Sequence, residues 1–132
     1  MNGSILDTNI IIDFFRNKQN VVDKILVMNN IFVSVTSVGE LYYGAYLSKN
    51  PEINIDKINV FLKKVNILEI DEDTAKAYGK IKFKLKVKGN PIPENDIWIA
   101  SISIQHNLEL LSNDKHFKYI DDLKVTEIVE KK

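Results

Sequence analysis

The sequence contains no cysteine, which excludes a disulfide framework and any metal site built on thiolate ligands. It also lacks an apolar run long enough to cross a membrane. The N-terminus does not show the basic start and long apolar stretch of a secretory signal. We therefore expect a cytoplasmic protein without membrane association.

Neither sign of charge is in excess, since 18 Lys and Arg residues balance 18 Asp and Glu residues. This balance argues against a strong non-specific nucleic-acid binder, whose domains tend to be basic, but not against an enzyme that handles nucleic acid at one site. Hydrophobic residues make up 45% of the chain, which is typical of a globular fold and too high for disorder. Without repeats or linkers, residues 1–132 are expected to form a single domain.

Segments with strand-like and helix-like spacing alternate along the chain. Strands are predicted at 5–6, 31–35, 67–70, 108–112 and 125–129, and helices at 9–16, 21–28, 38–46, 53–65, 71–88, 96–105 and 116–120. Thr8 or Asn9 is expected to cap the first helix. The segment 81–88 alternates apolar residues with lysines, as a strand would, but the acidic start at 71–73 and the Gly89-Asn90 stop favour a helix. The alternation predicts an α/β protein with three α/β/α layers and a mainly parallel sheet of about five strands.

Four acidic residues lie where predicted strands end or helices begin. Asp7 follows the first strand, Glu40 lies in the first turn of the helix after the second strand, Asp96 begins a helix, and Asp114 follows the fourth strand. Strand carboxyl ends share one edge of a parallel sheet, so we expect these carboxylates to converge on one cleft. Their repulsion would raise each pKa unless a cation lay among them. An oxygen-only site favours Mg²⁺ or Mn²⁺, and such a site suits phosphodiester cleavage by an activated water.

Each of these acids also has an ordinary structural explanation. Asp7 and Asp96 could serve only as helix caps. Glu40 could act only on the helix dipole, and Asp114 could be only a turn residue. The functional interpretation therefore depends on the four acids occurring together, in sequence contexts that share one chemistry.

Four segments resemble the motifs of the PIN-domain family. They are LDTN (6–9), VTSVGELYYGA (35–45), PENDIWIAS (93–101) and LLSNDKHF (110–117). Their order and spacing are most similar to those of VapC toxins from toxin–antitoxin pairs, and the resemblance covers the chain from about Leu6 to the last predicted strand. It implies a metal-dependent endoribonuclease that hydrolyses RNA phosphodiester bonds with Mg²⁺ or Mn²⁺. It also implies two protein partners, a small antitoxin and a second copy of the chain.

The resemblance assigns a role to each of the four acids. Asp7 matches the first motif acid and Asp96 the third, which implies that these two bind the metal directly. Glu40 matches the glutamate of the second motif, as a further ligand or a holder of metal-bound water. Asp114 matches the acid of the last motif.

Three polar residues beside these acids are also covered by the resemblance. Asn9 and Ser112 match residues that orient the carboxylates without binding the metal. His116 departs from the family pattern, because many relatives have an acid just before the phenylalanine of the last motif. We expect no loss of activity from this change, and we do not expect His116 to be a general base.

Basic and aromatic residues suggest further contacts. Lysines recur from 76 to 88, most simply as a solvated helix face, although Lys84 and Lys88 could instead contact RNA phosphates beside the cleft. The helices at 9–16 and 38–46 carry more aromatic residues than a small core needs, namely Phe14, Phe15, Tyr42, Tyr43 and Tyr46. An exposed patch of this kind marks a partner site, for a second copy or for an antitoxin.

Other classes of protein also use clustered acids. A receiver-like Mg²⁺-binding module would accept a phosphoryl group on Asp71, at the end of a middle strand, but the first strand offers one acid instead of the required pair. A phosphatase with an Asp-x-Asp motif would need an acid where Asn9 stands. A PIN-like scaffold that binds RNA or a protein partner without cleavage is disfavoured by the presence of all four motif acids.

Overall fold

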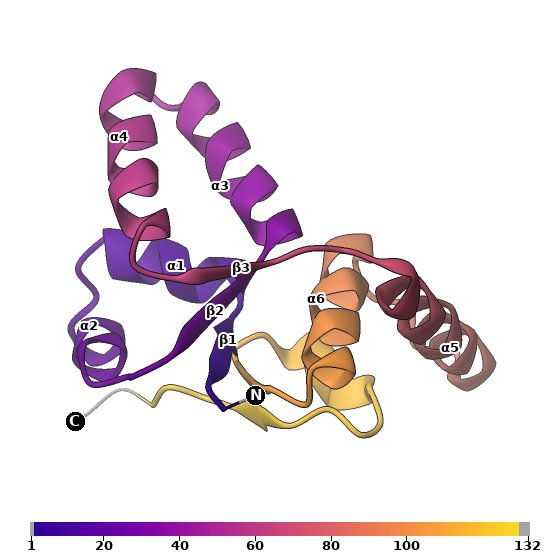
Figure 1. The fold of residues 1–132 in the computed structure, drawn as a ribbon. Coiled ribbons are helices and arrows are strands. Elements are labelled where there is room, and N and C mark those ends of the chain that lie inside the picture. The colour runs from indigo at the N-terminus through magenta and orange to yellow at the C-terminus, as the bar shows by residue number, and fades with distance from the viewer. Residues whose placement is uncertain (1, 130–132) are drawn as a thin grey trace.

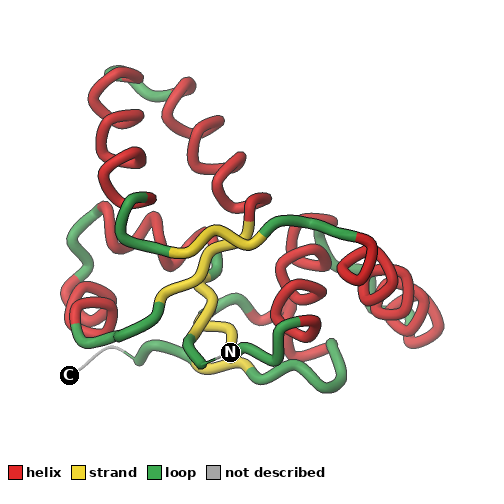
Figure 2. Tube along the Cα trace, viewed as in Figure 1, coloured by secondary structure: helices red, strands yellow, loops and turns green. Residues whose placement is uncertain are grey.

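A computed structural model describes residues 2–129. Five parallel strands form one sheet in the order β3-β2-β1-β4-β5. They are β1 (Ser4–Leu6), β2 (Ile31–Ser34), β3 (Asn66–Leu68), β4 (Glu109–Leu111) and β5 (Val125–Thr126). Because parallel strands need crossover connections, helices separate them along the chain, and Figure 2 shows the strands in the middle of the molecule with helices around them. The predicted fold class is confirmed.

Seven helices connect the strands in the described chain. They are α1 (Thr8–Phe15), α2 (Gln19–Leu26), α3 (Val35–Leu47), α4 (Pro51–Leu62), α5 (Glu72–Lys88), α6 (Glu94–Gln105) and the short 3₁₀ helix η1 (Lys115–Tyr119). α3 and α4 pack side by side and project beyond the sheet (Figure 1). Within the described residues, no helix is long and apolar enough to span a membrane.

The two faces of the sheet are covered by different helices. Successive strand residues point to opposite faces, so Leu6 packs in a core with α1 to α4, while Ile5 packs in a second core with α5, α6 and η1. Both side chains are fully buried. Residues buried on both faces explain why these strands read as continuous apolar runs.

The starts of α1 and α3 differ from the predicted ones. Asp7 itself caps α1, since its Oδ1 accepts a hydrogen bond from the Thr8 N–H at 2.8 Å, whereas Thr8 or Asn9 was the predicted cap. Ser34 caps α3 through its side chain, one residue before the end of the strand predicted at 31–35. α3 therefore begins earlier than predicted, and Glu40 lies in its second turn instead of its first.

α5 and α6 also show how local signals set helix ends. The whole of α5 is helical, as predicted, with a reciprocal capping box between Asp71 and Thr74 at its start. Gly89 ends it in the left-handed conformation, with φ of 72°. Pro93 is the residue before α6, so the helix starts two residues earlier than predicted and Asp96 lies within its first turn instead of capping it.

The two edge strands are shorter than predicted or shifted. β3 ends at Leu68, before the Glu69-Ile70 pair that the prediction included. β5 covers two residues instead of the five predicted at 125–129. An edge strand forms backbone hydrogen bonds with one neighbour only and is commonly short. A prediction from apolar composition alone therefore overestimates its length.

Candidate active site

Asp7 follows β1, the strand at which the order of the strands along the sheet reverses. β1 pairs with β2 on one side and with β4 on the other, and such a switch point opens a crevice beyond the strand carboxyl ends. Asp7 is only 3% exposed, yet both of its carboxylate oxygens have partners. Oδ1 accepts from the Thr8 N–H at 2.8 Å, and Oδ2 accepts from the Ser112 hydroxyl at 2.7 Å. The carboxylate is therefore fixed in orientation at the mouth of the crevice.

Ser112 links the ends of the first and fourth strands. It is fully buried, and while its hydroxyl donates to Asp7, its Oγ accepts from the Asp114 N–H at 3.0 Å. Asp114 in turn caps η1, accepting from the His116 N–H at 2.8 Å. One serine therefore bonds two of the predicted acids, and its orienting role stays a prediction.

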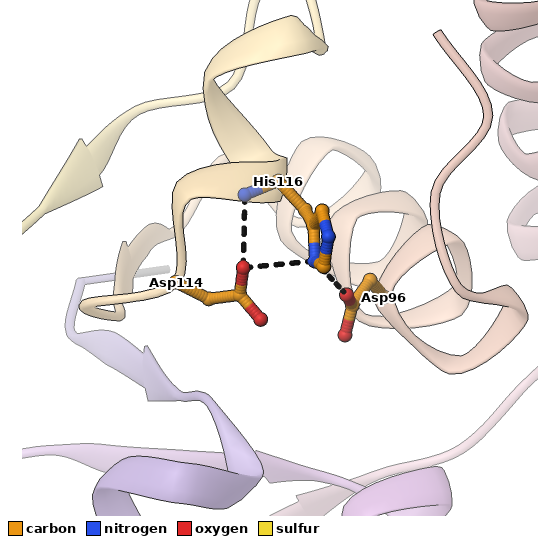
Figure 3. A group of neighbouring side chains, drawn as sticks. All are labelled: Asp96, Asp114 and His116. Atoms are coloured by element: carbon orange, nitrogen blue, oxygen red, sulfur yellow. Dashed lines mark hydrogen bonds and ion pairs between the residues drawn. The ribbon is translucent and has the colours of Figure 1, made fainter.

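Asp96, Asp114 and His116 form a compact group of possible metal ligands (Figure 3). One ligand atom from each lies within 4.8 Å of the others. His116 Nδ1 is 2.9 Å from Asp114 Oδ1 and 3.4 Å from Asp96 Oδ2. The first turn of α6 and the start of η1 supply these residues, so segments distant in sequence meet here.

Glu40 is held by Thr8, for which the sequence predicted only a role as a helix cap. The Thr8 hydroxyl donates to Glu40 Oε1 at 2.7 Å and lies 2.8 Å from Ser37 Oγ. Asn9 is exposed, and among the described residues its side chain has no hydrogen bond to the four acids. Because consecutive helix residues differ by about 100° in direction, the start of α1 at Thr8 turns the hydroxyl toward Glu40 and the amide toward solvent.

The electrostatics of the cluster disfavour bare negative charge. Burial raises the pKa of Asp7, hydrogen bonds from Ser112 and Thr8 lower it, and the charges of Asp114 and Glu40 raise it further. Burial, followed by repulsion from Asp7 and Asp114, raises the pKa of Asp96 to about 6, and His116 opposes this shift. No lysine or arginine of the described chain forms an ion pair with Asp96 or Asp114. Closely spaced carboxylates without a lysine or arginine partner fit a divalent cation.

Two lysines and one aspartate for which the sequence suggested other functions do not join the four acids. Lys88 Nζ bonds Asp121 Oδ1 at 2.8 Å, so part of its charge is already compensated, and Lys84 is half-buried on the same helix. Asp71, the residue that a receiver-like module would phosphorylate, is occupied as the cap of α5 through Thr74. The arrangement therefore does not favour the receiver-like alternative.

The aromatic residues divide between a groove and the open surface. Phe14, Phe15 and Phe61 contact one another with ring centroids 5.3 to 6.2 Å apart, and they line a groove of about 760 Å³ formed largely by α1, α2 and α4. Tyr43 and Tyr46 are 67% and 69% exposed on α3. The predicted apolar surface is therefore present.

Comparison with known proteins identifies the relatives of this chain. The family model described as the PIN domain matches residues 4–123. Ribonuclease VapC1 of Haemophilus influenzae is 36% identical over 124 residues, which cover 90% of this chain and 92% of that protein. The tRNA(fMet)-specific endonuclease VapC of Shigella flexneri is 31% identical over 123 residues, covering 91% and 93%.

Solved structures agree with this relationship. The structure of VapBC2 from Rickettsia felis, bound to a DNA fragment from its promoter, gives a TM-score of 0.88 at 30% identity, covering 94% of this chain and 97% of that chain. DNA-bound VapBC from Salmonella typhimurium gives a TM-score of 0.91 at 27% identity, covering 98% and 100%.

Proposed function

This chain belongs to the PIN-domain family and, within it, to the VapC ribonucleases, and we propose that it is the endoribonuclease toxin of a toxin–antitoxin pair. The observation that carries the proposal is the convergence of Asp7, Asp96 and Asp114, from three distant segments, at the carboxyl edge of one sheet. The resemblance of the sequence motifs implies that these three acids match the family's motif acids. The substrate is RNA, and the reaction is hydrolysis of a phosphodiester bond.

We propose that the reaction depends on Mg²⁺ or Mn²⁺. Asp7, Glu40, Asp96 and Asp114 supply the carboxylate oxygens that such ions prefer. When bound, the cation would lower the pKa of water and offset negative charge on the leaving oxygen. Burial, together with repulsion among the carboxylates, raises the pKa values of Asp7 and Asp96, and a bound cation would offset both effects.

The roles that we propose for the protein groups follow from their contacts. Asp96 and Asp114, at 14% and 23% side-chain exposure, would hold the cation together with the more buried Asp7. Ser112 donates to the Asp7 carboxylate and would keep it in place. Glu40, whose Oε1 accepts from the Thr8 hydroxyl, would orient the attacking water and accept its proton.

We propose two protein partners and a compartment. A small antitoxin would block the activity until the toxin is released, and a second copy of the chain would form a homodimer. The exposed tyrosines of α3 and the aromatic groove beside α4 offer apolar surface for both. The cytoplasm is the compartment that we propose, because the RNA substrate is found there.

The test is RNA cleavage by the purified protein with Mg²⁺, Mn²⁺ or EDTA. Initiator tRNA, named for the Shigella flexneri relative, and ribosomal RNA are the substrates to offer. Asp7→Asn keeps the shape of the side chain and removes its charge, so cleavage should disappear. Asp56→Asn, on the exposed surface of α4, is the matched control and should cleave normally. Cleavage that survives Asp7→Asn or EDTA would contradict the proposal.

A further inference from the structure

His116 places a nitrogen atom inside a site that is otherwise built from carboxylates. Figure 3 shows the imidazole between Asp96 and Asp114, with one ring nitrogen turned toward both acids. His116 therefore adds a nitrogen donor to a group whose other possible ligands, Asp96 and Asp114, are oxygen donors. The nitrogen donor has chemical consequences because nitrogen and oxygen ligands favour different cations.

The spacing of the three side chains is that of neighbouring ligands. In an octahedral site with bonds of about 2.1 Å, adjacent ligand atoms lie about 3 Å apart. Nδ1 of His116 lies 2.9 Å from Asp114 Oδ1 and 3.4 Å from Asp96 Oδ2. Nδ1 therefore lies from each carboxylate oxygen at about the distance of neighbouring ligands, and one ligand atom from each of the three residues lies within 4.8 Å of the others.

The remainder of the imidazole does not oppose this role. The His116 side chain is 47% exposed, so water can hydrogen-bond the nitrogen that points away from the acids, as the outer nitrogen of a ligating histidine requires. The segment also holds its shape without the imidazole. The His116 backbone N–H bonds Asp114, and Phe117, only 1% exposed, anchors η1 in the core.

We propose that His116 Nδ1 is a direct ligand of the catalytic cation, and that this site therefore selects a first-row transition-metal dication such as Mn²⁺ over Mg²⁺. The inference rests on the proposed function and refines its cofactor. Mg²⁺ prefers oxygen ligands almost exclusively, whereas imidazole binds transition-metal ions, with affinity rising from Mn²⁺ through Co²⁺. One nitrogen among carboxylates keeps the site able to bind Mn²⁺ and lowers its affinity for Mg²⁺.

A second role for Nδ1 is incompatible with metal ligation. A protonated Nδ1 can donate to Asp114 and orient it, but a nitrogen that binds a metal carries no proton. The two roles predict different effects of substitution. His116→Asn keeps an N–H donor near the position of Nδ1 and removes the ring nitrogen, while His116→Asp replaces the nitrogen donor with a carboxylate.

The experiment uses Mn²⁺ as the probe and the purified full chain. Pulsed EPR of bound Mn²⁺ detects ¹⁴N coupling when an imidazole nitrogen is a direct ligand. The chain has two histidines, so His106→Asn, at the end of α6, is the matched control. We expect ¹⁴N coupling in the wild type and in His106→Asn, and none in His116→Asp. In equilibrium dialysis, we expect the Mn²⁺-to-Mg²⁺ affinity ratio to fall at least about tenfold in His116→Asp and in His116→Asn.

Two results would overturn the inference. The first is Mn²⁺ bound to the wild type without ¹⁴N coupling, and the second is an unchanged affinity ratio in His116→Asn, as expected if the histidine only orients Asp114. Neither would affect the proposed function, since metal would still bind and Asp7→Asn would still abolish cleavage. Failure of the proposed function gives a different pattern, with no metal-dependent cleavage of RNA by the wild type.

Discussion

A carboxylate as buried as Asp7 stays in place only through its neighbours. Two hydrogen bonds hold its oxygens, and one of them comes from Ser112, which also accepts from the Asp114 N–H. A buried polar group left without a partner costs about 1 to 3 kcal/mol. At the scale of single residues, the site therefore depends on small polar side chains as much as on the acids.

Ser112→Ala tests this dependence. The substitution leaves Asp7 Oδ2 and the Asp114 N–H without their partner, so we expect the free energy of unfolding to fall by about 1 to 3 kcal/mol and metal affinity to fall by about 10- to 100-fold. Chemical denaturation and equilibrium dialysis measure the two effects. Ser103→Ala is the control, because Ser103 is equally buried but bonds only its own helix at Ile99, and its metal affinity should not change.

The raised pKa of Asp96 predicts how the stability of the protein depends on pH. The pKa of Asp96 is raised from 3.8 to about 6 in the folded protein, so the folded state retains a proton that the unfolded chain has lost. The free energy of unfolding of the metal-free protein should therefore rise as the pH falls from about 7 to about 5. Asp96→Asn removes a partly buried charge and should stabilise the metal-free protein at pH 7 by about 1 to 2 kcal/mol.

Urea denaturation at pH 5 and pH 7, in the presence of EDTA, measures this effect. Asp96→Asn should show a smaller rise between the two pH values than the wild type, and the exposed-site variant Asp56→Asn should behave like the wild type. A metal-free Asp96→Asn variant less stable than the wild type at pH 7 would contradict the inference that the charge of Asp96 destabilises the metal-free fold.

At the scale of elements, local sequence signals predicted that the helices exist. They predicted less well the residues at which the helices begin, and these residues carry the site. Alternating lysines at 81–88 could have formed a strand, but the Asp71 and Thr74 capping box and the left-handed Gly89 keep the segment helical. The four acids were predicted from their places beside strands and helices. The contact between Thr8 and Glu40 was not, because it depends on which residue begins α1, and helix propensity defines a start only within one or two residues.

α5 carries the proposed RNA contacts. Lys84→Glu with Lys88→Glu should weaken RNA binding several-fold in a filter-binding assay at low salt, since phosphate contacts are electrostatic. The loss should be smaller at high salt. Lys76→Glu with Lys86→Glu makes the same charge change at exposed positions of α5 and is the control. Equal losses in the two double variants would indicate general charge repulsion instead of a specific contact.

α3 carries the proposed contact between copies of the chain. Tyr43 and Tyr46 are largely exposed there, beside the equally exposed Leu47. Light scattering should show a dimer for the wild type and a monomer for Tyr43→Glu with Tyr46→Glu, because the change places charge in an apolar interface. Phe83→Glu with Val87→Glu is the control, at positions 67% and 71% exposed on α5. A monomeric wild type would exclude the homodimer.

At the scale of the whole molecule, the order of the strands brings the site together. The first strand of the chain lies in the centre of the sheet, between β2 and β4, so residues near position 7 and near position 114 meet at its carboxyl end. The alternation of strands and helices predicted this edge without specifying the order of the strands. Which acids approach most closely could not be predicted, since Asp96 and Asp114 meet His116 only through the packing of α6 and η1. We propose that residues 1–132 fold as a single domain around this sheet.

The most direct test of the account measures bound Mn²⁺ and RNA cleavage in the same samples of the wild type and Asp96→Asn. EPR gives the fraction of protein that holds the ion, and gel electrophoresis gives the rate of cleavage. We predict that the rate rises in proportion to the bound ion in the wild type, and that Asp96→Asn loses both. Cleavage by protein without bound Mn²⁺, or undiminished cleavage by Asp96→Asn, would contradict the proposal that this carboxylate cluster is a metal-dependent ribonuclease site.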